Sequence, residues 1–194
     1  ICMYINMKRV SIADIKNNNN VKEVDSDGEL TLYCYDTCTN DSAYEYKASR
    51  GVVFKGEQLI FQGLPYTDEY VVRDGDMYGI GDFENTTFFH SYEGCLIRAF
   101  HYNGKWYITT HKKLDACNSR WASKKSYGEL FHESIEWDNA LKDMNTKSCY
   151  LFLLENNDEN RLVCNALDKP NVFHVATIDE NGKLDVNDNI GVKK

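Results

Sequence analysis

The densest group of residues that could do chemistry lies between residues 88 and 116, in the stretch FFHSYEGCLIRAFHYNGKWYITTHKKLDA. It contains three histidines and three lysines together with Glu93 and Arg98. His101 and His111 lie on opposite arms of a predicted hairpin and could face each other, and imidazole is a common zinc ligand. The ligand spacing matches no standard zinc motif, so we favour a solvated hairpin with polar residues on one face.

Two β-hairpins must position these residues. In the stronger one, Cys95–Tyr102 alternates apolar and polar residues, an Asn-Gly pair supplies the positive φ of a type I′ turn, and Lys105–Thr110 returns. The other hairpin joins Ser49–Phe54 to Gln58–Gln62 through a turn at Gly56. Both hairpins predict antiparallel sheet.

One helix is predicted, over Ser126–Leu141, where apolar residues recur at mixed three-to-four spacing. Ser126 and Glu129 fit a capping box at its start. The segment Asn17–Gly28 is polar and rich in turn residues, and we predict a loop there. Further strands are predicted at Glu29–Tyr35, Cys149–Leu154, Arg161–Cys164 and Val172–Ile178, so the expected fold class is α+β, an antiparallel sheet with one main packing helix.

Composition limits the function classes. The chain has 194 residues, 42% of them hydrophobic, which suits one sizeable core. We predict a strand-and-loop extension over 1–43 and a main domain over 44–194. The net charge of −8 argues against a general nucleic-acid-coating role, because phosphate contacts need lysine and arginine.

The cysteines and the start of the chain suggest an intracellular, cytoplasmic protein. The seven cysteines are scattered, and Cys34 and Cys38 form a C-x3-C with no second pair at a zinc-finger interval. Free thiols in a reducing compartment fit this pattern better than a metal site. No apolar run reaches the roughly 18 residues of a membrane-spanning helix, and the opening residues lack the features of a signal peptide. We therefore expect no membrane partner.

The stretch Ser91–Leu96 (SYEGCL) resembles the nucleophile motif of RNA ligases and related covalent nucleotidyltransferases. In that family a lysine in K-x-D/E-G attacks the α-phosphate of ATP and forms lysyl-AMP. The acid, here Glu93, contacts the ribose, and a hydrophobic strand and hairpin follow the glycine. Every position of the motif matches except the first, where Ser91 replaces the lysine.

Three other stretches appear in the family's order and together extend the resemblance over 44–194. SRGVVF resembles an A-R-G-hydrophobic-F segment whose arginine, here Arg50, contacts phosphate. GLPYTDEYVV resembles a P-F-x-K-F-F-N-like run whose aromatic, here Tyr70, sits near adenine. YLFLLENNDENRLV resembles F-E-x-x-x-P-x-N-R-I-V, with Arg161 in place and the glutamate falling on Leu154.

The departures from the family pattern suggest a degenerate domain. A serine hydroxyl is far too weak to replace the amine unaided. Asp68 and Glu69 stand where a phosphate-contacting lysine is expected, Leu154 replaces the glutamate with Glu155 one residue late, and the last two family motifs are not recognisable. We expect nucleotide binding without lysyl-AMP formation. By resemblance, ATP and Mg²⁺ are the expected ligands, and no metal site is assigned. The nucleotide-binding candidates are Arg50, Tyr70, Glu93, Lys112 and Arg161.

Other interpretations remain open. A basic loop that contains Trp121, Lys124 and Lys125 could contact an RNA backbone and stack a base, or it could simply be solvated. An active RNA ligase or capping-type enzyme would need another lysine, of which Lys105 and Lys112 are the nearest, or a missing C-terminal segment. A structural role in a larger assembly, with an unknown protein partner, is the third alternative.

Overall fold

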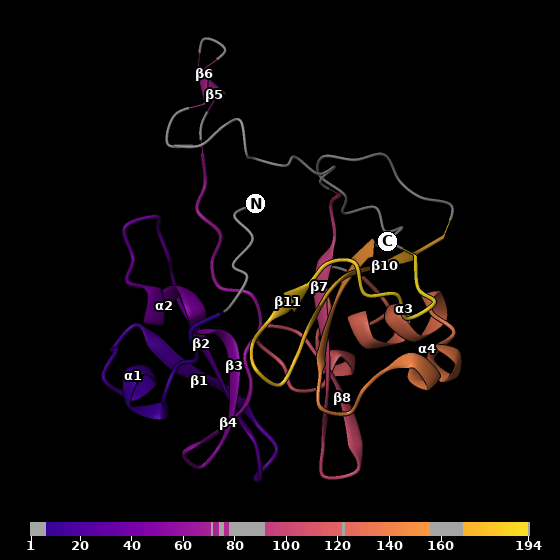
Figure 1. The fold of residues 1–194 in the computed structure, drawn as a ribbon, viewed down its shortest axis with the longest axis horizontal. Coiled ribbons are helices and arrows are strands. Elements are labelled where there is room, and N and C mark those ends of the chain that lie inside the picture. The colour runs from indigo at the N-terminus through magenta and orange to yellow at the C-terminus, as the bar shows by residue number, and fades with distance from the viewer. Residues whose placement is uncertain are drawn as a thin grey trace.

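The computed structural model describes residues 7–70, 72–73, 76–77, 92–121, 123–155 and 169–193. Its larger elements are two antiparallel sheets with short helices on their outer faces, and the fold class is α+β. Figure 1 shows the sheets side by side, with α1 and α2 on one side of the molecule and α3 and α4 on the other.

The first sheet has the strand order β1-β2-β3-β4, and every neighbouring pair is antiparallel. The hairpin predicted over residues 49–62 is confirmed as β3 and β4, and Gly56 has φ +56° in its turn. Its strands are β1 (Val21–Ser26), β2 (Thr31–Tyr35), β3 (Arg50–Lys55) and β4 (Gln58–Phe61).

The second sheet has the order β11-β10-β9-β7-β8. The predicted type I′ turn is confirmed by positive φ angles of 49° at Asn103 and 78° at Gly104. Its strands are β7 (Cys95–Tyr102), β8 (Lys105–Thr109), β9 (Cys149–Glu155), β10 (Asn171–Ile178) and β11 (Leu184–Asp185). A separate two-stranded ribbon comprises β5 (Val72–Arg73) and β6 (Asp76–Met77).

The two sheets pack face to face through a shared apolar layer. Side chains from β2, β3 and β4 meet side chains from β7, β9 and β10 in one buried cluster. Phe61 of the first sheet stacks on Phe100 of the second, with ring centroids 5.1 Å apart and planes 19° apart. Burial of this layer holds the sheets together, because each side chain of this size contributes about 1.5–3 kcal/mol.

Helices cover the outer faces. The helices α1 (Ile12–Lys16) and α2 (Tyr44–Ala48) lie over the first sheet, where Ile15 and Ala48 pack with Val52 and Phe54 of β3. On the second sheet, residues of α3 (Tyr127–Ser134) and α4 (Trp137–Asp143) share a buried cluster with β7 and β9. The short helix η1 (Ala116–Asn118) precedes α3.

Two of the predicted elements are wrong. The single helix expected over 126–141 is two helices, because Ile135 is extended (φ −129°, ψ 138°) and ends α3. The break lets Trp137 pack against Phe131 at 5.7 Å between ring centroids. The capping box of Ser126 and Glu129 is confirmed. The loop expected over 17–28 contains the edge strand β1, which pairs with β2.

The first sheet spans the boundary predicted between residues 43 and 44. Strand β2 lies before that boundary and pairs with β3 behind it, from Thr31↔Phe54 to Cys34↔Arg50. Residues 1–43 therefore supply two strands of the first sheet, in addition to α1.

Candidate functional site

The charged residue deepest between the sheets is Arg98. On β7 the side chains of Leu96 and Phe100 point into the layer between the sheets, and Arg98 lies between them on the same face. Only 1% of its surface is exposed. A buried cation in an otherwise apolar face destabilises the fold unless hydrogen bonds or an opposite charge compensate for its lost hydration.

Arg98 joins the two sheets through backbone carbonyls. Its Nη1 donates to the carbonyl oxygens of Arg50, at 2.8 Å, and Gly51, at 2.9 Å. Gly51 has φ +74°, and a Cβ there would lie 2.3 Å from Arg98 Nη1. A glycine is needed at this point because the guanidinium fills the space of a side chain. The strand that follows the YEG stretch thus meets the SRG stretch across the two sheets.

The other edge of the guanidinium is unpaired. Nε and Nη2 of Arg98 are buried and have no hydrogen-bond partner within the described part of the chain. The ring of Phe61 lies 5.7 Å from the guanidinium carbon and offers a cation–π contact. Burial, with a smaller contribution from the charge of Arg50, lowers the pKa of Arg98 to about 10. Arg98 still carries its charge at neutral pH.

A turn at the end of β8 adds two more basic residues. Thr110 N donates to the carbonyl of Lys113 at 2.9 Å, and the turn presents His111 and Lys112 on the surface. Burial, followed by the charges of Arg98, Arg50 and Lys112, lowers the pKa of His111 to about 4. We call Arg50, Arg98, His111 and Lys112 the cationic cluster.

The acid on the face of the cationic cluster is Glu155. Leu154, the position that strict spacing gives to the family glutamate, is buried in the core beneath α3 and α4. Neighbouring strand residues face opposite sides, so Glu155 faces the layer between the sheets, as Leu151 does. It is 5% exposed and pairs across the sheet with Asn171, whose Nδ2 lies 3.4 Å from its Oε2. The one-residue delay therefore puts the carboxylate on the inner face.

The acid at Asp68 is paired. Lys47 Nζ lies 2.6 Å from Asp68 Oδ1, and the two side chains are 14% and 32% exposed. Lys47 of α2 thus lies beside the segment in which the phosphate-contacting lysine of the family is missing. This ion pair offsets the negative charge of Asp68, which on its own would repel a triphosphate.

An aromatic stack lies just before the start of β7, next to Glu93. Tyr92 stacks on Phe173 of β10 with centroids 4.9 Å apart, and Lys193 Nζ lies 4.7 Å from the Phe173 centroid. At Gly94 a Cβ would lie 2.5 Å from the carbonyl oxygen of Leu154, which explains the glycine of the YEG stretch. Tyr92 is 48% exposed, so the stack is accessible from solvent.

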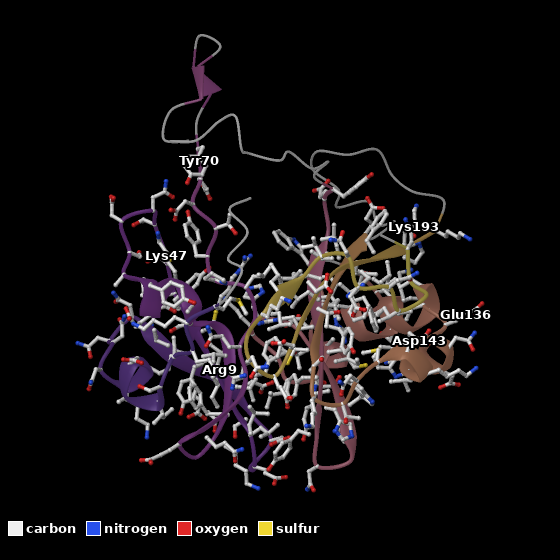
Figure 2. All side chains as sticks on the ribbon, in the orientation of Figure 1. Arg9, Lys47, Tyr70, Glu136, Asp143 and Lys193 are labelled. Carbon is white, nitrogen blue, oxygen red and sulfur yellow. The ribbon has the colours of Figure 1, made fainter. Side chains whose placement is uncertain are left out.

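Tyr70 stands apart from the core of the first sheet. It is 44% exposed, and Figure 2 shows it beyond Lys47 on the segment that leaves that sheet. A different tyrosine of the same segment, Tyr66, packs edge-on against Tyr35 at 6.4 Å. Burial raises the pKa of Tyr35 to about 12, and the charge of Arg50 opposes this rise. Tyr66 follows a proline directly, as in the P-F of the family run, and that signal could have identified it.

The basic loop comprises Arg120, Trp121, Lys124 and Lys125. Trp121 is 67% exposed, and Lys124 and Lys125 are exposed as well. Lys125 Nζ lies 2.6 Å from Glu133 Oε2 of α3, so part of the charge of the loop is paired.

Several sequence candidates fall elsewhere. Ser91 and Arg161 lie outside the described residues. The prediction that His101 faces His111 is wrong, because His101 pairs with Trp106 and His111 lies past the end of β8. Lys105 begins β8 at the far end of the hairpin, about 26 Å along the strand from Gly94 at 3.3 Å per residue.

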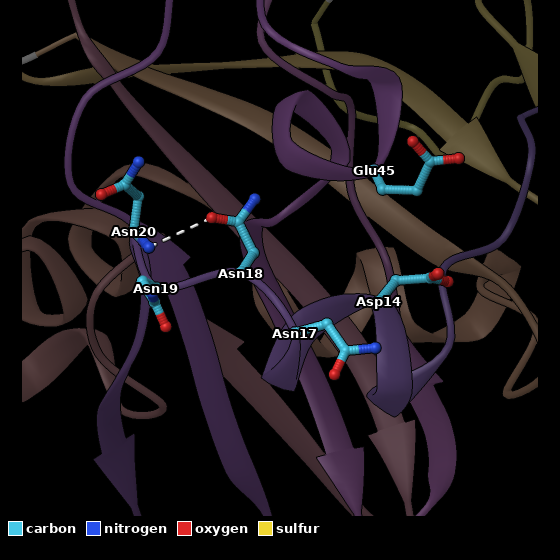
Figure 3. Close-up of a pocket in the computed structure, with 6 residues that line it drawn as sticks. All are labelled: Asp14, Asn17, Asn18, Asn19, Asn20 and Glu45. Atoms are coloured by element: carbon cyan, nitrogen blue, oxygen red, sulfur yellow. Dashed lines mark hydrogen bonds between the residues drawn. The ribbon is translucent and has the colours of Figure 1, made fainter.

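Two depressions lie away from the cationic cluster. One, of about 500 Å³, is an open surface bowl lined by Asp14, Glu45 and the run Asn17–Asn20 (Figure 3). The other, of about 290 Å³, lies between the sheets at the opposite end, with Arg9, His101 and Lys147 among its lining residues. Neither includes a residue of the cationic cluster.

The donor set of the cationic cluster fits phosphate oxygens rather than a metal ion. Guanidinium and ammonium groups and the N–H of a neutral imidazole donate hydrogen bonds to anions. Within the described ranges, no group of three or more histidine, cysteine or acidic residues is arranged to hold a metal ion. No helix of the described residues is long and apolar enough to span a membrane.

Comparison with known proteins finds three viral relatives. The chain is 33% identical to the immediate-early protein ICP-46 homolog of Invertebrate iridescent virus 6, over 76% of the chain and 36% of that protein. It is 27% identical to the homolog of Invertebrate iridescent virus 3, over 74% of the chain and 40% of that protein. It is 25% identical to immediate-early protein ICP-46 of Frog virus 3, over 72% and 38%. The chain thus spans well under half the length of these relatives. No protein-family model matches it.

Proposed function

We propose that the chain is an RNA-ligase-like nucleotidyltransferase domain that binds nucleotide without forming lysyl-AMP. The observation that carries the proposal is the contact of Arg98 with the carbonyls of Arg50 and Gly51. It brings the hairpin after the YEG stretch against the SRG stretch, nearly fifty residues away. Both stretches were singled out by their resemblance to nucleotide-contacting motifs.

Two of the departures from the family pattern, at Asp68 and Leu154, count less against nucleotide binding when the neighbouring side chains are considered. Asp68 is paired with Lys47, and Glu155 faces the inner layer that Leu154 does not reach. Both observations favour retained nucleotide binding. The serine at position 91 remains the departure that removes the amine nucleophile, and it is the reason for proposing binding without catalysis.

The proposal also covers the cellular location of the domain and its second ligand. We place it inside the cell, because the described cysteines, Cys34, Cys38, Cys95, Cys117 and Cys149, are free thiols. RNA is the proposed second ligand, contacted by Trp121 with Lys124 and Lys125. The relatives carry names that refer to immediate-early proteins and specify no reaction.

The deciding experiment incubates the protein with α-³²P-labelled ATP or GTP and Mg²⁺, followed by a denaturing gel. We expect no covalent adduct, together with saturable ATP binding in a calorimetric titration. Absence of ATP, GTP and RNA binding up to millimolar concentration would favour the structural role instead.

An active fragment is the second candidate, and one observation favours Lys112 as its nucleophile. Lys112 lies in the cationic cluster, whereas Lys105 lies at the distant tip of the hairpin. A covalent adduct that disappears in Lys112→Gln and persists in Lys105→Gln would establish this candidate and contradict the binding-only proposal.

A further inference from the structure

Three basic side chains and a histidine gather where the start of β3, the middle of β7 and the turn after β8 meet. Arg50, Arg98 and Lys112 all act on the charge state of His111. The groups that most affect Arg98 itself are Cys34, Arg50, Cys95 and Tyr35, and no carboxylate of the described chain is among them. Like charges held this close repel each other, so the arrangement stabilises an anion placed among them.

The free edge of Arg98 has the geometry of an oxyanion clamp. Nη1 is occupied by two backbone carbonyls, which fix the plane of the guanidinium. Nε and Nη2 are the two adjacent nitrogens of the opposite edge, and both lack a partner in the described part of the structure. Parallel N–H groups of this kind bind two oxygens of a carboxylate or phosphate.

We propose that the cationic cluster is a binding site for a phosphate group, with Nε and Nη2 of Arg98 donating to two of its oxygens. Arg50 and Lys112 supply further positive charge, and the exposed turn with His111 is the side from which the anion enters. A phosphate is favoured over a carboxylate because three cationic side chains meet at the site, and a dianion neutralises more of their charge.

The local backbone packs closely around the guanidinium. Gly51 has no side chain, and His111 Cα lies 2.7 Å from the place that a Gly51 Cβ would occupy. The glycine, the guanidinium and the backbone of the turn therefore meet at one point. Thr110 Oγ1 accepts from Lys113 N at 3.1 Å, and this bond shapes the turn that carries His111 and Lys112.

This site deepens the proposed nucleotide function, on which its biological ligand depends, but its chemistry can be tested without a nucleoside. The probe is inorganic phosphate, titrated calorimetrically into the full chain at constant ionic strength, with chloride as the control anion. We expect saturable binding of phosphate and pyrophosphate. Arg98→Met should weaken phosphate binding by about 10- to 100-fold, because two charge-assisted hydrogen bonds are lost.

Variants of exposed residues keep the test valid if Arg98→Met fails to fold. Lys112→Gln and His111→Gln alter exposed side chains and should each weaken phosphate binding several-fold with the fold intact. The matched control is Lys16→Gln, an exposed lysine at the end of α1, which should leave phosphate binding unchanged. Equal effects of Lys16→Gln and Lys112→Gln would reduce the site to general charge and overturn the inference.

Titrations of ATP, ADP and adenosine separate this inference from the proposed function. ATP binding that is insensitive to Arg98→Met and Lys112→Gln would overturn the phosphate site and leave the nucleotide function standing. Phosphate binding that depends on Arg98, with ATP no tighter than pyrophosphate, would support the site and contradict the nucleotide function. No binding of any anion would overturn both.

Discussion

The cationic cluster and the basic loop are both positively charged regions of an acidic protein, but their surroundings differ. In the cluster, Arg98 is buried and leaves two nitrogens without a partner within the described residues. In the loop, Lys125 is exposed and ion-paired with Glu133. The loop lysine already has an acidic partner and is open to solvent, whereas the remaining donors of Arg98 are buried without a partner among the described residues.

This difference shows how similar charges can have different implications. An exposed ion pair contributes about 0–1 kcal/mol and implies little about function. A buried cation with unpaired donors costs several kcal/mol, a cost that the rest of the fold must offset. The free-energy cost of a buried, unpaired cation is therefore better evidence for a binding site than the number of basic residues in a stretch.

The largest expected effect comes from closing the space beside Arg98. Gly51→Ala forces a positive φ on a residue with a Cβ and places that Cβ against Arg98 Nη1 and the His111 backbone. We expect a loss of about 2–5 kcal/mol in the free energy of unfolding, the sum of backbone strain and overpacking. Urea denaturation measures it.

Gly56→Ala is the matched control for this substitution. Gly56 also has a positive φ, of +56°, but a Cβ there would meet nothing within 4 Å. It should cost only the backbone strain, about 1 kcal/mol. Equal losses in the two variants would show that the contact between Gly51 and Arg98 is unimportant.

A second test concerns the basic loop. Trp121→Ala should leave thermal stability within about 0.5 kcal/mol, since the side chain is 67% exposed. If the loop stacks a base, the same change weakens binding of single-stranded RNA by about 1–3 kcal/mol. Fluorescence anisotropy with a labelled oligonucleotide measures it, and unchanged affinity would leave the loop as a solvated segment.

The pH dependence of the cationic cluster is a third test. The pKa of His111 is lowered to about 4 in the folded protein, so its stabilising contribution is complete above its ordinary pKa of about 6.5. That contribution is lost as the pH falls from about 6.5 toward 4, because the unfolded chain then binds the proton more readily. His111→Gln should therefore show a shallower loss of urea stability over this window than the unaltered protein.

Sulfate provides the companion measurement, because it keeps its double charge throughout that pH range. An anion beside Arg98, Arg50 and Lys112 offsets the charges that oppose protonation of His111. Sulfate affinity should rise as the pH falls from 7 to 5 in the unaltered protein and stay flatter in His111→Gln. Identical pH profiles would separate His111 from the anion site.

The smallest expected effect is in the ion pair of the basic loop. Lys125→Gln should change the free energy of unfolding by less than about 1 kcal/mol, and 0.5 M salt should remove most of the difference. A loss comparable to that of Gly51→Ala would contradict the distinction between the two basic regions.

Local chemistry made much of the fold predictable. The alternation and the Asn-Gly turn of Cys95–Thr110 specify a hairpin without reference to the rest of the chain, as do the strands that flank Gly56. The prediction of one helix over residues 126–141 is wrong for a reason that the sequence contains. Leu130 and Ile135 are five residues apart, a spacing that a single continuous helix does not put on one face. β1 was missed because its pairing with β2 is a tertiary preference that outweighs the polarity of its sequence.

The site was less predictable because its decisive contacts are long-range. Arg50 was identified through resemblance. Arg98 was counted among the residues that could do chemistry but was assigned no role, although a cation at an inward position between Leu96 and Phe100 was a usable signal. Strict spacing assigns the family glutamate to position 154, which is a leucine. Glu155 is recognised only when the structure shows which side chains of β9 face the layer between the sheets. No local pattern links Lys47 to Asp68, since 21 residues separate them.

The segment that begins at Met7 has a practical consequence for anyone preparing fragments of this protein. Met7 N bonds to the Gly182 carbonyl beside the second sheet, while Gln62, just past β4, donates to the carbonyl of Lys8 and accepts from Val10 N. A recombinant chain trimmed to start at Tyr44 would lose this clasp together with β1 and β2. It would leave the long edge of β3 bare, and such an edge invites aggregation. We therefore expect a fragment whose start is chosen by motif matching alone to aggregate.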